Sequence, residues 1–293
     1  MRRPIHIAIC THTAERIERT LLGVRWQTTP VDSVTITCDG DSAELEAGLR
    51  AACLRAGVAA TILLRAQPDV CRLGQVRNNA VRRLLEQGAG DADVLVFLDG
   101  DCVPAPEVAI GHEQRLRRGD LVLAHRFDLT AEQSAAFDEA ALRAGRWPYA
   151  PTPEQIRAIN RRHRRYQRQA LLRRFGLTKA HKPKIIGGHF GVTIGQWRKV
   201  NGQDETYGEY GQEDDDFARR IYASGGRPVV ATRELLAFHQ YHPTRAPGAW
   251  RDSPNAQRLS EAFAVRCASG LESGLAQPPL RIVEVTPEAP PAP

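Results

Sequence analysis

The sequence contains no apolar run close to the roughly 20 residues that a membrane-spanning helix needs. Its start, Met1-Arg2-Arg3-Pro4, leads directly into residues 5–10, a stretch too short and too alternating for the apolar region of a signal peptide. Both absences argue against a membrane-spanning or an exported protein, and we therefore expect a cytoplasmic one.

Close cysteine pairs and lysine are also lacking. The six cysteines lie far apart and form no C-x-x-C pair, which argues against a disulfide framework or a zinc site made of thiolates. Only four of the 40 basic residues are lysine, so the net charge of +6 comes mainly from arginine. Arginine binds phosphate with two parallel hydrogen bonds. A GC-rich genome also raises the arginine content, so composition alone does not identify the partner.

The first half of the 293-residue chain alternates between strand-like and helix-like patterns. Strands are predicted at residues 5–10, 34–38, 59–64 and 94–98, and helices at residues 13–27, 42–56 and 74–86. Continuous β-branched runs separated by helices predict an α/β fold with a buried, mostly parallel, Rossmann-like sheet flanked by helices. Ligands of such sheets bind beyond the carboxyl ends of the strands, where Asp39 and Asp99 stand.

The second half has a different pattern, with basic helical segments, a Gly-rich stretch, an acidic helix start and a Pro-rich tail. We expect a single domain over residues 1–275, followed by a disordered tail over residues 276–293. Within the domain we expect a nucleotide-binding half (1–127), a basic helical insertion (128–182), an acceptor and catalytic half (183–250) and a C-terminal helix (251–275).

The triplet Asp99-Gly100-Asp101 follows the predicted strand 94–98. Asp-Gly is a common turn dipeptide, so a plain surface turn is one interpretation. Two carboxylates at the end of a buried strand also offer the oxygen ligands that Mg²⁺ and Mn²⁺ favour, usually together with substrate phosphates. The buried strand before the triplet favours the metal site.

Three further groups are candidates for chemistry. The run Glu213-Asp214-Asp215-Asp216 opens a helix, where acidic residues are favoured by the helix dipole, but one of them could also act as a general base. His239 and His242, three residues apart, could supply a nitrogen ligand to the metal, although a lone histidine is more often structural. Arg77 could pair with a nucleotide phosphate or lie on a solvated helix surface.

An arginine-rich stretch occupies residues 161–174, where seven of fourteen residues are arginine. A solvated helix face is the simplest interpretation. An anionic membrane surface or nucleic acid would be alternative partners. Because the stretch lacks interleaved aromatic residues and a recognised nucleic-acid module, the sequence favours no nucleic acid and leaves peripheral membrane contact open.

The order of these elements resembles the family 2 glycosyltransferases of the GT-A fold. The resemblance covers about residues 5–245, and its more specific part is similar to the C-terminal motif of galactosyltransferase-type enzymes. That part runs from Gly187-Gly188-His189-Phe190 through Val200-Asn201-Gly202 to Glu213-Asp214-Asp215-Asp216-Phe217. It implies transfer of a sugar from a nucleotide-sugar, favouring a UDP-sugar, to a glycan or lipid-linked acceptor in bacterial cell-surface polysaccharide synthesis.

The resemblance also implies a role for each site residue. The nucleotide-sugar would be bound by Thr11, Asp39, Arg77, Asp99, Gly100 and Gly188. A Mn²⁺ or Mg²⁺ ion would be bound by Asp101 directly, with Asp99 and His239, and His242 is an alternative to His239. Asp214 would take the proton from the acceptor hydroxyl, with inversion at the anomeric carbon, and Glu213 would hold sugar hydroxyls.

Two departures from the family pattern concern the acceptor side, because Tyr210 and Gln212 replace the more usual Trp and Gly. Two other functions remain as alternatives. A sugar-phosphate nucleotidyltransferase is disfavoured because residues 11–16 after the first strand are not Gly-rich. A non-enzymatic protein binding an anionic surface or nucleic acid would leave the acidic motifs unexplained.

Overall fold

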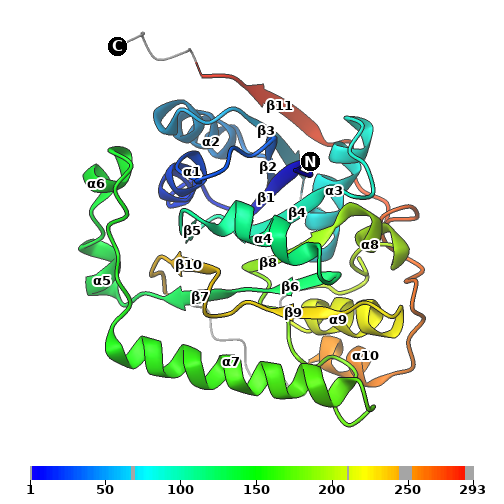
Figure 1. Cartoon of the computed structure of the whole chain (residues 1–293). Helices are drawn as coiled ribbons and strands as arrows, with labels where there is room; N and C mark the ends of the chain where they lie inside the picture. The colour runs from blue at the N-terminus through cyan, green and yellow to red at the C-terminus, as the bar shows by residue number, and fades with distance from the viewer. Residues whose placement is uncertain (1, 67–69, 210, 244–252, 288–293) are drawn as a thin grey trace.

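An eight-stranded sheet runs through the computed structural model, which describes residues 2–66, 70–209, 211–243 and 253–287 (Figure 1). The strand order is β11-β3-β2-β1-β4-β8-β6-β9. The strands are β1 (Ile5–Thr11), β2 (Ser33–Asp39), β3 (Ala60–Arg65), β4 (Val94–Asp99), β6 (Leu121–Leu123), β8 (His189–Thr193), β9 (Pro228–Val230) and β11 (Arg281–Val285). From β3 to β4 the strands are parallel, whereas β8 runs antiparallel to both β4 and β6. The predicted mixed, mostly parallel sheet is confirmed.

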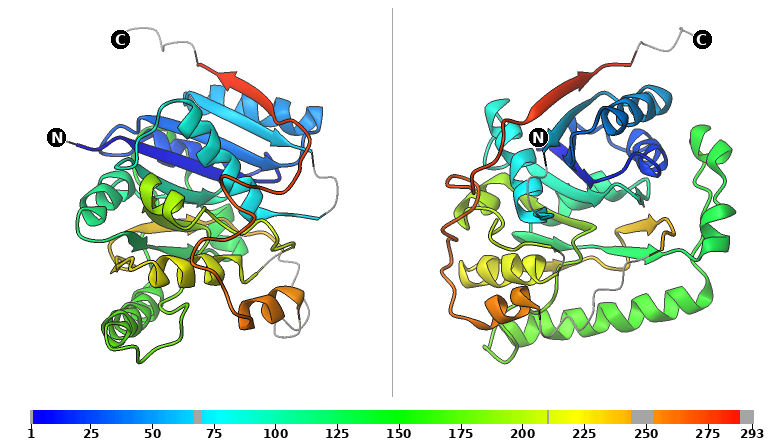
Figure 2. Two further views of the ribbon diagram at one scale, coloured as in Figure 1. Left: turned by 90° about the vertical axis from the view of Figure 1, so that its right-hand side faces the viewer. Right: turned by 180° about the vertical axis from the view of Figure 1, so that it is seen from behind.

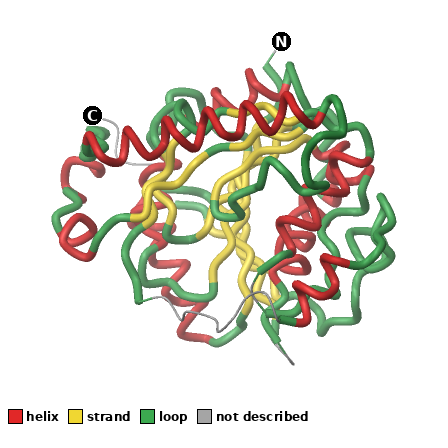
Figure 3. Tube along the Cα trace, turned by 90° about the horizontal axis from the view of Figure 1, so that it is seen from below, coloured by secondary structure: helices red, strands yellow, loops and turns green. Residues whose placement is uncertain are grey.

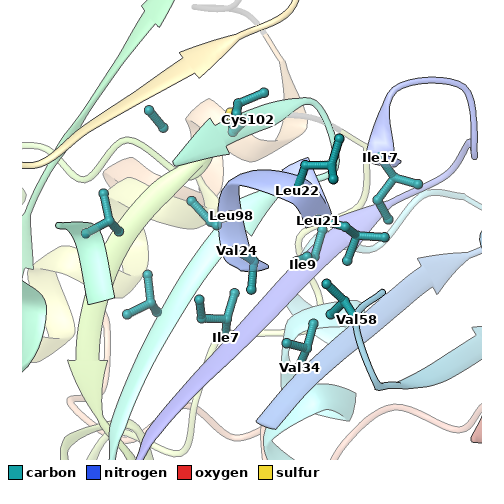
Figure 4. Packing of buried hydrophobic residues seen from close by; sticks show 14 of the residues in the cluster. Ile7, Ile9, Ile17, Leu21, Leu22, Val24, Val34, Val58, Leu98 and Cys102 are labelled. Atoms are coloured by element: carbon teal, nitrogen blue, oxygen red, sulfur yellow. The ribbon is translucent and has the colours of Figure 1, made fainter. Parts of the chain in front are cut away.

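Both faces of the sheet are buried, which explains why its strands are apolar throughout. In β1, the side chains of Ile5, Ile7 and Ile9 pack with α1 (Ile17–Arg25) and α2 (Ala43–Ala56). Figure 4 shows Ile7 and Ile9 beside the apolar side chains of α1. Those of Ala8 and Cys10 belong to a second core with α3 (Leu73–Glu86), α8 (Ile194–Lys199) and α9 (Glu213–Ala223). Seen from below, the strands form a twisted central band between helices (Figure 3).

The helix ends follow local capping rules. The hydroxyl of Ser42 accepts a hydrogen bond from the Leu45 N–H at 3.1 Å, and the left-handed Gly57 (φ 65°) ends α2. The first helix is shorter than the predicted residues 13–27. Before it, the Thr11 hydroxyl bonds both the N–H and the C=O of Thr13, which holds a turn instead of a helix.

A small second sheet has the order β5-β10-β7, formed by β5 (Cys102–Pro104), β7 (His125–Asp128) and β10 (Leu236–His239). Its register pairs His239 with Cys102 on one side and with Asp128 on the other. Since β5 begins directly after Asp101, this pairing brings the end of β10 to the end of β4. Helix α4 (Val108–Leu116) follows β5 and packs on the large sheet.

The predicted helical insertion is present as α5 (Ala131–Ala135), α6 (Glu139–Arg143) and α7 (Pro153–Arg173). A capping box of Thr152 and Gln155 starts α7, with Pro153 in its first turn. Helix α6 is tied to α1 by ion pairs such as Arg19–Glu139 (3.2 Å). Helix α7 runs along the outside of the molecule (Figures 1 and 2). In the described part of the chain, no helix has the length and apolarity to cross a membrane.

Two expectations about the C-terminal part need correction. The helix predicted for residues 251–275 is limited to α10 (Pro254–Ser260), because residues 261–275 instead bind along α3, for example through the Leu271 carbonyl, which accepts from Arg82. Within the tail expected to be disordered, residues 281–285 form β11, which pairs antiparallel with β3. The β-branched residues Ile282, Val283 and Val285 favour a strand there despite the surrounding prolines. Residues 251–252 and 288–293 lie outside the described part.

Gly23 in α1 gives a test of this packing. A Cβ at Gly23 would lie 2.8 Å from Pro104 Cδ and 3.0 Å from the Pro104 carbonyl oxygen in β5. Alanine would gain about 1 kcal/mol of helix propensity, but overpacking costs about 1–3 kcal/mol. We expect Gly23→Ala to lower the free energy of unfolding, measured by urea denaturation. The control Arg50→Ala, on the exposed face of α2, should leave it unchanged. A more stable Gly23→Ala protein would contradict this close contact.

Candidate active site

The carboxyl ends of β1, β2 and β4 meet at one edge of the sheet. The register pairs Thr11 with Cys38 and Cys10 with Asp99, so Thr11, Asp39 and Asp99 all end their strands at the same level. The sequence predicted this edge as the ligand-binding side, and the structure brings these three residues to it.

Asp39 is buried and partly unsatisfied. Its Oδ1 accepts a hydrogen bond from Arg65, whose Nε donates to Gln75 at 2.7 Å. Its Oδ2 is buried and has no hydrogen-bond partner among the described residues. A buried acceptor without a donor is costly, so this oxygen is suited to accept an N–H or O–H from a ligand.

Gly100 keeps the two carboxylates of the triplet close to β1. Its N–H donates to the Cys10 carbonyl at 2.8 Å. A Cβ at this position would lie 2.7 Å from both Cβ and Oγ1 of Thr11. No other residue type fits there without displacing Thr11, so Gly100 acts here by allowing this close approach.

Asp101, His239 and His242 form a cluster whose possible ligand atoms lie within 4.8 Å of one another. The Nε2 atoms of His239 and His242 lie 3.4 and 3.2 Å from Asp101 Oδ2. The second ring nitrogen of His239, Nδ1, lies 3.2 Å from Asp128 Oδ1. A carboxylate behind a histidine ligand is the usual support in metal sites. One carboxylate and two imidazoles suit a divalent transition metal such as Mn²⁺.

The charges in this cluster reinforce one another. Burial alone would lower the pKa of His239, but its hydrogen bonds with Asp101 and Asp128 raise it to about 9. Burial would likewise raise the pKa of Asp101, but the hydrogen bond from His239 and the charge of His242 hold it below its usual value. Asp101 and Asp128 thus favour positive charge at this point, and a metal ion bound by the neutral imidazole would take the place of the His239 proton.

Asp99 faces the same edge with a different partner. Its Oδ2 accepts a hydrogen bond from Arg126 Nη1 at 2.8 Å. Burial raises its pKa, Arg126 opposes this, and the charge of Asp101 adds to it. A Cβ on Gly188 would lie 2.4 Å from Asp99 Oδ2 and 2.6 Å from Arg126 Nη1. The predicted site residue Gly188 therefore covers the Asp99–Arg126 pair at contact distance.

The start of α9 supplies the other half of the site. Asp214 Oδ1 accepts hydrogen bonds from Arg77 Nη1 at 2.9 Å and from Gln203 Nε2 at 3.3 Å. A Cβ on Gly187 would lie 2.2 Å from Asp214 Oδ2 and 2.7 Å from Arg77 Nη2. The consecutive residues Gly187 and Gly188 therefore contact Asp214 and Asp99 respectively, so the two acidic motifs meet across them.

The four acidic residues of α9 divide into two pairs. Asp215 accepts a hydrogen bond from Lys184, and Asp216 accepts from Arg219 (3.0 Å) and Arg220 (2.7 Å). Both are buried and have structural partners. Glu213 is also buried, but its Oε2 has no hydrogen-bond partner among the described residues.

The residue before this run has an unusual backbone. Gln212 adopts a left-handed conformation with φ 75° at the N-terminus of α9. Glycine adopts this conformation without strain, which fits the Gly that the family pattern has here. The second departure, Tyr210, lies outside the described residues.

Several contacts of the site were not predicted from the sequence. Arg126 and Asp128 lie in β7, a four-residue strand that the sequence pattern did not reveal. Gln203 lies within the galactosyltransferase-type segment but was given no role. Arg77 was expected to bind the nucleotide-sugar, and this role stays a prediction. In the structure its hydrogen bonds go to Asp214 and Gln203.

A polar cleft of about 480 Å³ lies next to the end of β10. Its wall includes Gln240 and Tyr241, which follow His239 in the chain. The rest of the lining comes from α1, α5, α6 and the turn before α1.

The Glu213 carboxyl should give the protein a distinct pH dependence. Burial and the charge of Asp214 raise its pKa to about 8, against the opposing effect of Arg77. The folded state then binds more protons than the unfolded state between about pH 4.5 and 8, so this group makes stability fall as pH rises through that window. We expect Glu213→Gln to remove that decline in urea denaturation at several pH values. If the free energy of unfolding changed with pH in the same way in the wild type and in Glu213→Gln, the raised pKa would be contradicted.

Asp128 should support the metal through His239. Loss of a carboxylate behind a histidine ligand lowers metal affinity about 10–100-fold. Because the Asp128 side chain is 74% exposed, we expect Asp128→Asn to weaken Mn²⁺ binding by about tenfold, at the low end of that range. Isothermal titration would measure this, with Asp91→Asn on the surface as control. Equal affinity of both variants would show that Asp128 does not position His239.

Comparison with known proteins agrees with the geometry. Residues 173–243 match the family model described as the N-terminal domain of galactosyltransferase. This span contains Gly187, Gly188, Glu213, Asp214 and His239. No curated protein matches the chain in sequence.

Two solved GT-A-type glycosyltransferases have a similar fold. S. aureus TarS is 13% identical with a TM-score of 0.53, over 82% of this chain and 37% of TarS. GalNAc-T7, solved with UDP, GalNAc and Mn²⁺, is 16% identical with a TM-score of 0.56, over 88% of this chain and 47% of GalNAc-T7. The chain thus spans less than half the length of either protein. The more specific resemblance to family 2 stays a prediction. The chain has the GT-A-type glycosyltransferase fold, and its segment 173–243, which matches the galactosyltransferase model, contains the glycine pair, the acidic start of α9 and His239.

Proposed function

We propose that this protein is a metal-dependent, inverting glycosyltransferase that moves a sugar from a UDP-sugar to a hydroxyl of a glycan or a lipid-linked acceptor. One observation carries the proposal: Gly187 and Gly188 separate Asp214 from Asp99 by a single residue step. A metal–diphosphate side and a general-base side therefore lie next to each other, as displacement at an anomeric carbon requires.

The nucleotide side of the proposal rests on β1, β2 and β4. The orphan Oδ2 of Asp39 would accept a hydrogen bond from the base or ribose, beside Thr11. Arg126, held by Asp99, would supply a positive charge at the phosphates. The UDP and Mn²⁺ named with the fold relative GalNAc-T7 support the choice of donor and ion.

Asp101, His239 and His242 would hold the ion, with Asp99 beside them. A divalent metal bound there would stabilise the negative charge that grows on the departing diphosphate. Mn²⁺ suits the imidazole nitrogens better than Mg²⁺ does. His239 and His242 lie at similar distances from Asp101, so we propose both as ligands.

Asp214 would be the general base. Both of its hydrogen bonds end on Oδ1, one from the Arg77 guanidinium and one from the Gln203 amide. Asp214 Oδ2, toward Gly187, would take the proton from the acceptor hydroxyl as that oxygen bonds to the anomeric carbon and the carbon–phosphate oxygen bond breaks. Attack from the face opposite the diphosphate inverts the configuration. Glu213, protonated in its buried position, would donate a hydrogen bond to a sugar hydroxyl.

We place the reaction in the cytoplasm, in the synthesis of bacterial cell-surface polysaccharide. The thiols of Cys10, Cys38, Cys53, Cys102 and Cys267 are buried and free. Free thiols are typical of a reducing compartment, and nucleotide-sugar donors are used there.

Binding and turnover should separate the two halves of the site. We expect Asp214→Asn to lose about 10²–10⁴-fold in turnover, the usual contribution of a positioned base, while UDP with Mn²⁺ still raises its melting temperature. Asp101→Asn should lose both the turnover and the rise in melting temperature with UDP and Mn²⁺. Turnover of a UDP-sugar panel and thermal shift measure the two effects, with Asp91→Asn as control. Wild-type turnover in Asp214→Asn would contradict its role, and a product of retained configuration would exclude this mechanism.

A further inference from the structure

Helix α7 has two faces of opposite character. Ile159, His163 and Tyr166 are buried against the body of the protein, where the His163 Nδ1 lies 3.1 Å from the Thr232 hydroxyl. The opposite face carries Arg157, Arg161, Arg164, Arg168 and Leu171, all exposed. These positions follow the helical spacing of three and four residues, so they form one continuous stripe.

The stripe ends in an apolar tip. In the turn after α7, the side chains of Phe175 and Leu177 are 69% and 68% exposed, and Leu171 in the last turns of the helix is 53% exposed. Large apolar side chains exposed together are unusual for a surface that faces water alone. Arg168 and Arg174 flank this tip in sequence and are exposed with it.

The positive charge of this surface is not neutralised locally. The sequence has eleven arginine and lysine residues between positions 157 and 184 and no acidic residue from 155 to 203. Among the described residues, none of the four arginines of the stripe forms an ion pair. Lys184 at the end of this segment is paired with Asp215, inside the fold. The outer face therefore has a strong positive potential with no internal counter-charge.

We propose that the outer face of α7, with the tip of Leu171, Phe175 and Leu177, docks the protein on an anionic lipid bilayer. Arginines along a helix attract lipid phosphates, and exposed aromatic and aliphatic side chains enter the interface between headgroups and acyl chains. A helix lying flat on the surface uses both features, which are continuous here. Nucleic acid would account for the arginines but not for the aliphatic side chains at the tip.

The position of α7 in the fold fits this partner. It lies along one outer side of the molecule, and the views agree that its length is presented there (Figures 1 and 2). Its 21 residues keep the stripe straight over the whole helix. A flat bilayer can therefore contact all the stripe residues at once.

Vesicle binding tests the charge part of the proposal. The wild-type chain should sediment with vesicles of phosphatidylcholine and phosphatidylglycerol, and far less with phosphatidylcholine alone. Each arginine near an anionic surface contributes roughly fivefold, so Arg161→Gln/Arg168→Gln should bind about 30-fold more weakly. The matched control Arg50→Gln/Arg118→Gln removes two exposed charges elsewhere and should bind within about twofold of wild type, because salt screens distant charges.

The apolar tip gives a second, independent readout. Salt weakens the charge contribution and leaves apolar burial intact. We therefore expect Phe175→Ser/Leu177→Ser to lose the part of vesicle binding that persists at high salt. Unchanged thermal melting would confirm that each variant folds, since the four substituted side chains are exposed.

Several results would overturn the proposal. Equal binding to neutral and anionic vesicles, or equal weakening by the two arginine pairs, would show that α7 is not the docking face. Tighter binding to a single-stranded oligonucleotide than to anionic vesicles, lost in Arg161→Gln/Arg168→Gln, would assign the stripe to nucleic acid instead. None of these measurements uses sugar transfer, so their outcome is independent of the proposed enzymatic function.

Discussion

The ion pair between the buried Arg77 and the partly exposed Asp214 is the contact on which the candidate site depends. Arg77 is 2% exposed, and its guanidinium lies between α3 and the first turn of α9. A buried charge is costly unless it is paired, so the two helices cannot separate without leaving Arg77 unpaired. The same guanidinium lies close to Gly187, and a side chain at position 187 would displace it. One cation thus fixes α9, α3 and the glycine pair relative to each other.

The neighbouring polar residues of α3 strengthen this arrangement. Asn78 donates to the Gln203 carbonyl (2.8 Å) and to Glu205 (2.9 Å), and Arg82 pairs with Glu205 at 2.6 Å. Because all of these groups have partners, the buried polar face of α3 specifies one position for the segment that leads to α9. The Asp214 carboxylate then has one orientation, which a general base needs. Gln212 in a left-handed conformation is tolerated in this firmly held turn.

How far the sequence predicted this site depends on where each residue lies. Asp39 and Asp99 were predicted because they follow strands, and strand ends can be located from apolar runs, whereas Thr11 was named only from the family resemblance. Arg126 and Asp128 were not predicted, since β7 is short and its sequence, His-Arg-Phe-Asp, is half charged. Their importance comes from pairing with β10, a contact between residues more than a hundred positions apart. Local pattern carries no information about such a pairing.

The acidic run at residues 213–216 also shows what local sequence cannot predict. Four adjacent carboxylates look alike in sequence, and helix dipole and catalysis were equally good explanations for them. All three aspartates have a cationic partner, but only Asp214 also lies against Gly187, next to Asp99. The C-terminal strand β11 was missed for a related reason. The proline content indicated a disordered tail, but the three β-branched residues within its middle pair with β3.

Helix α7 and the candidate active site are joined by a short and well-defined path. The turn after α7 leads through Arg173, which bonds the carbonyls of Lys179, Ala180 and Lys182, to Lys184. Lys184 is paired with Asp215, the neighbour of Asp214 in the first turn of α9. Three residues later comes Gly187, in contact with Asp214. A surface that holds α7 therefore also fixes the orientation of the acceptor side of the site, because no flexible domain boundary separates them. For an enzyme whose acceptor is attached to a lipid, this connection would present Asp214 at a constant height above the bilayer.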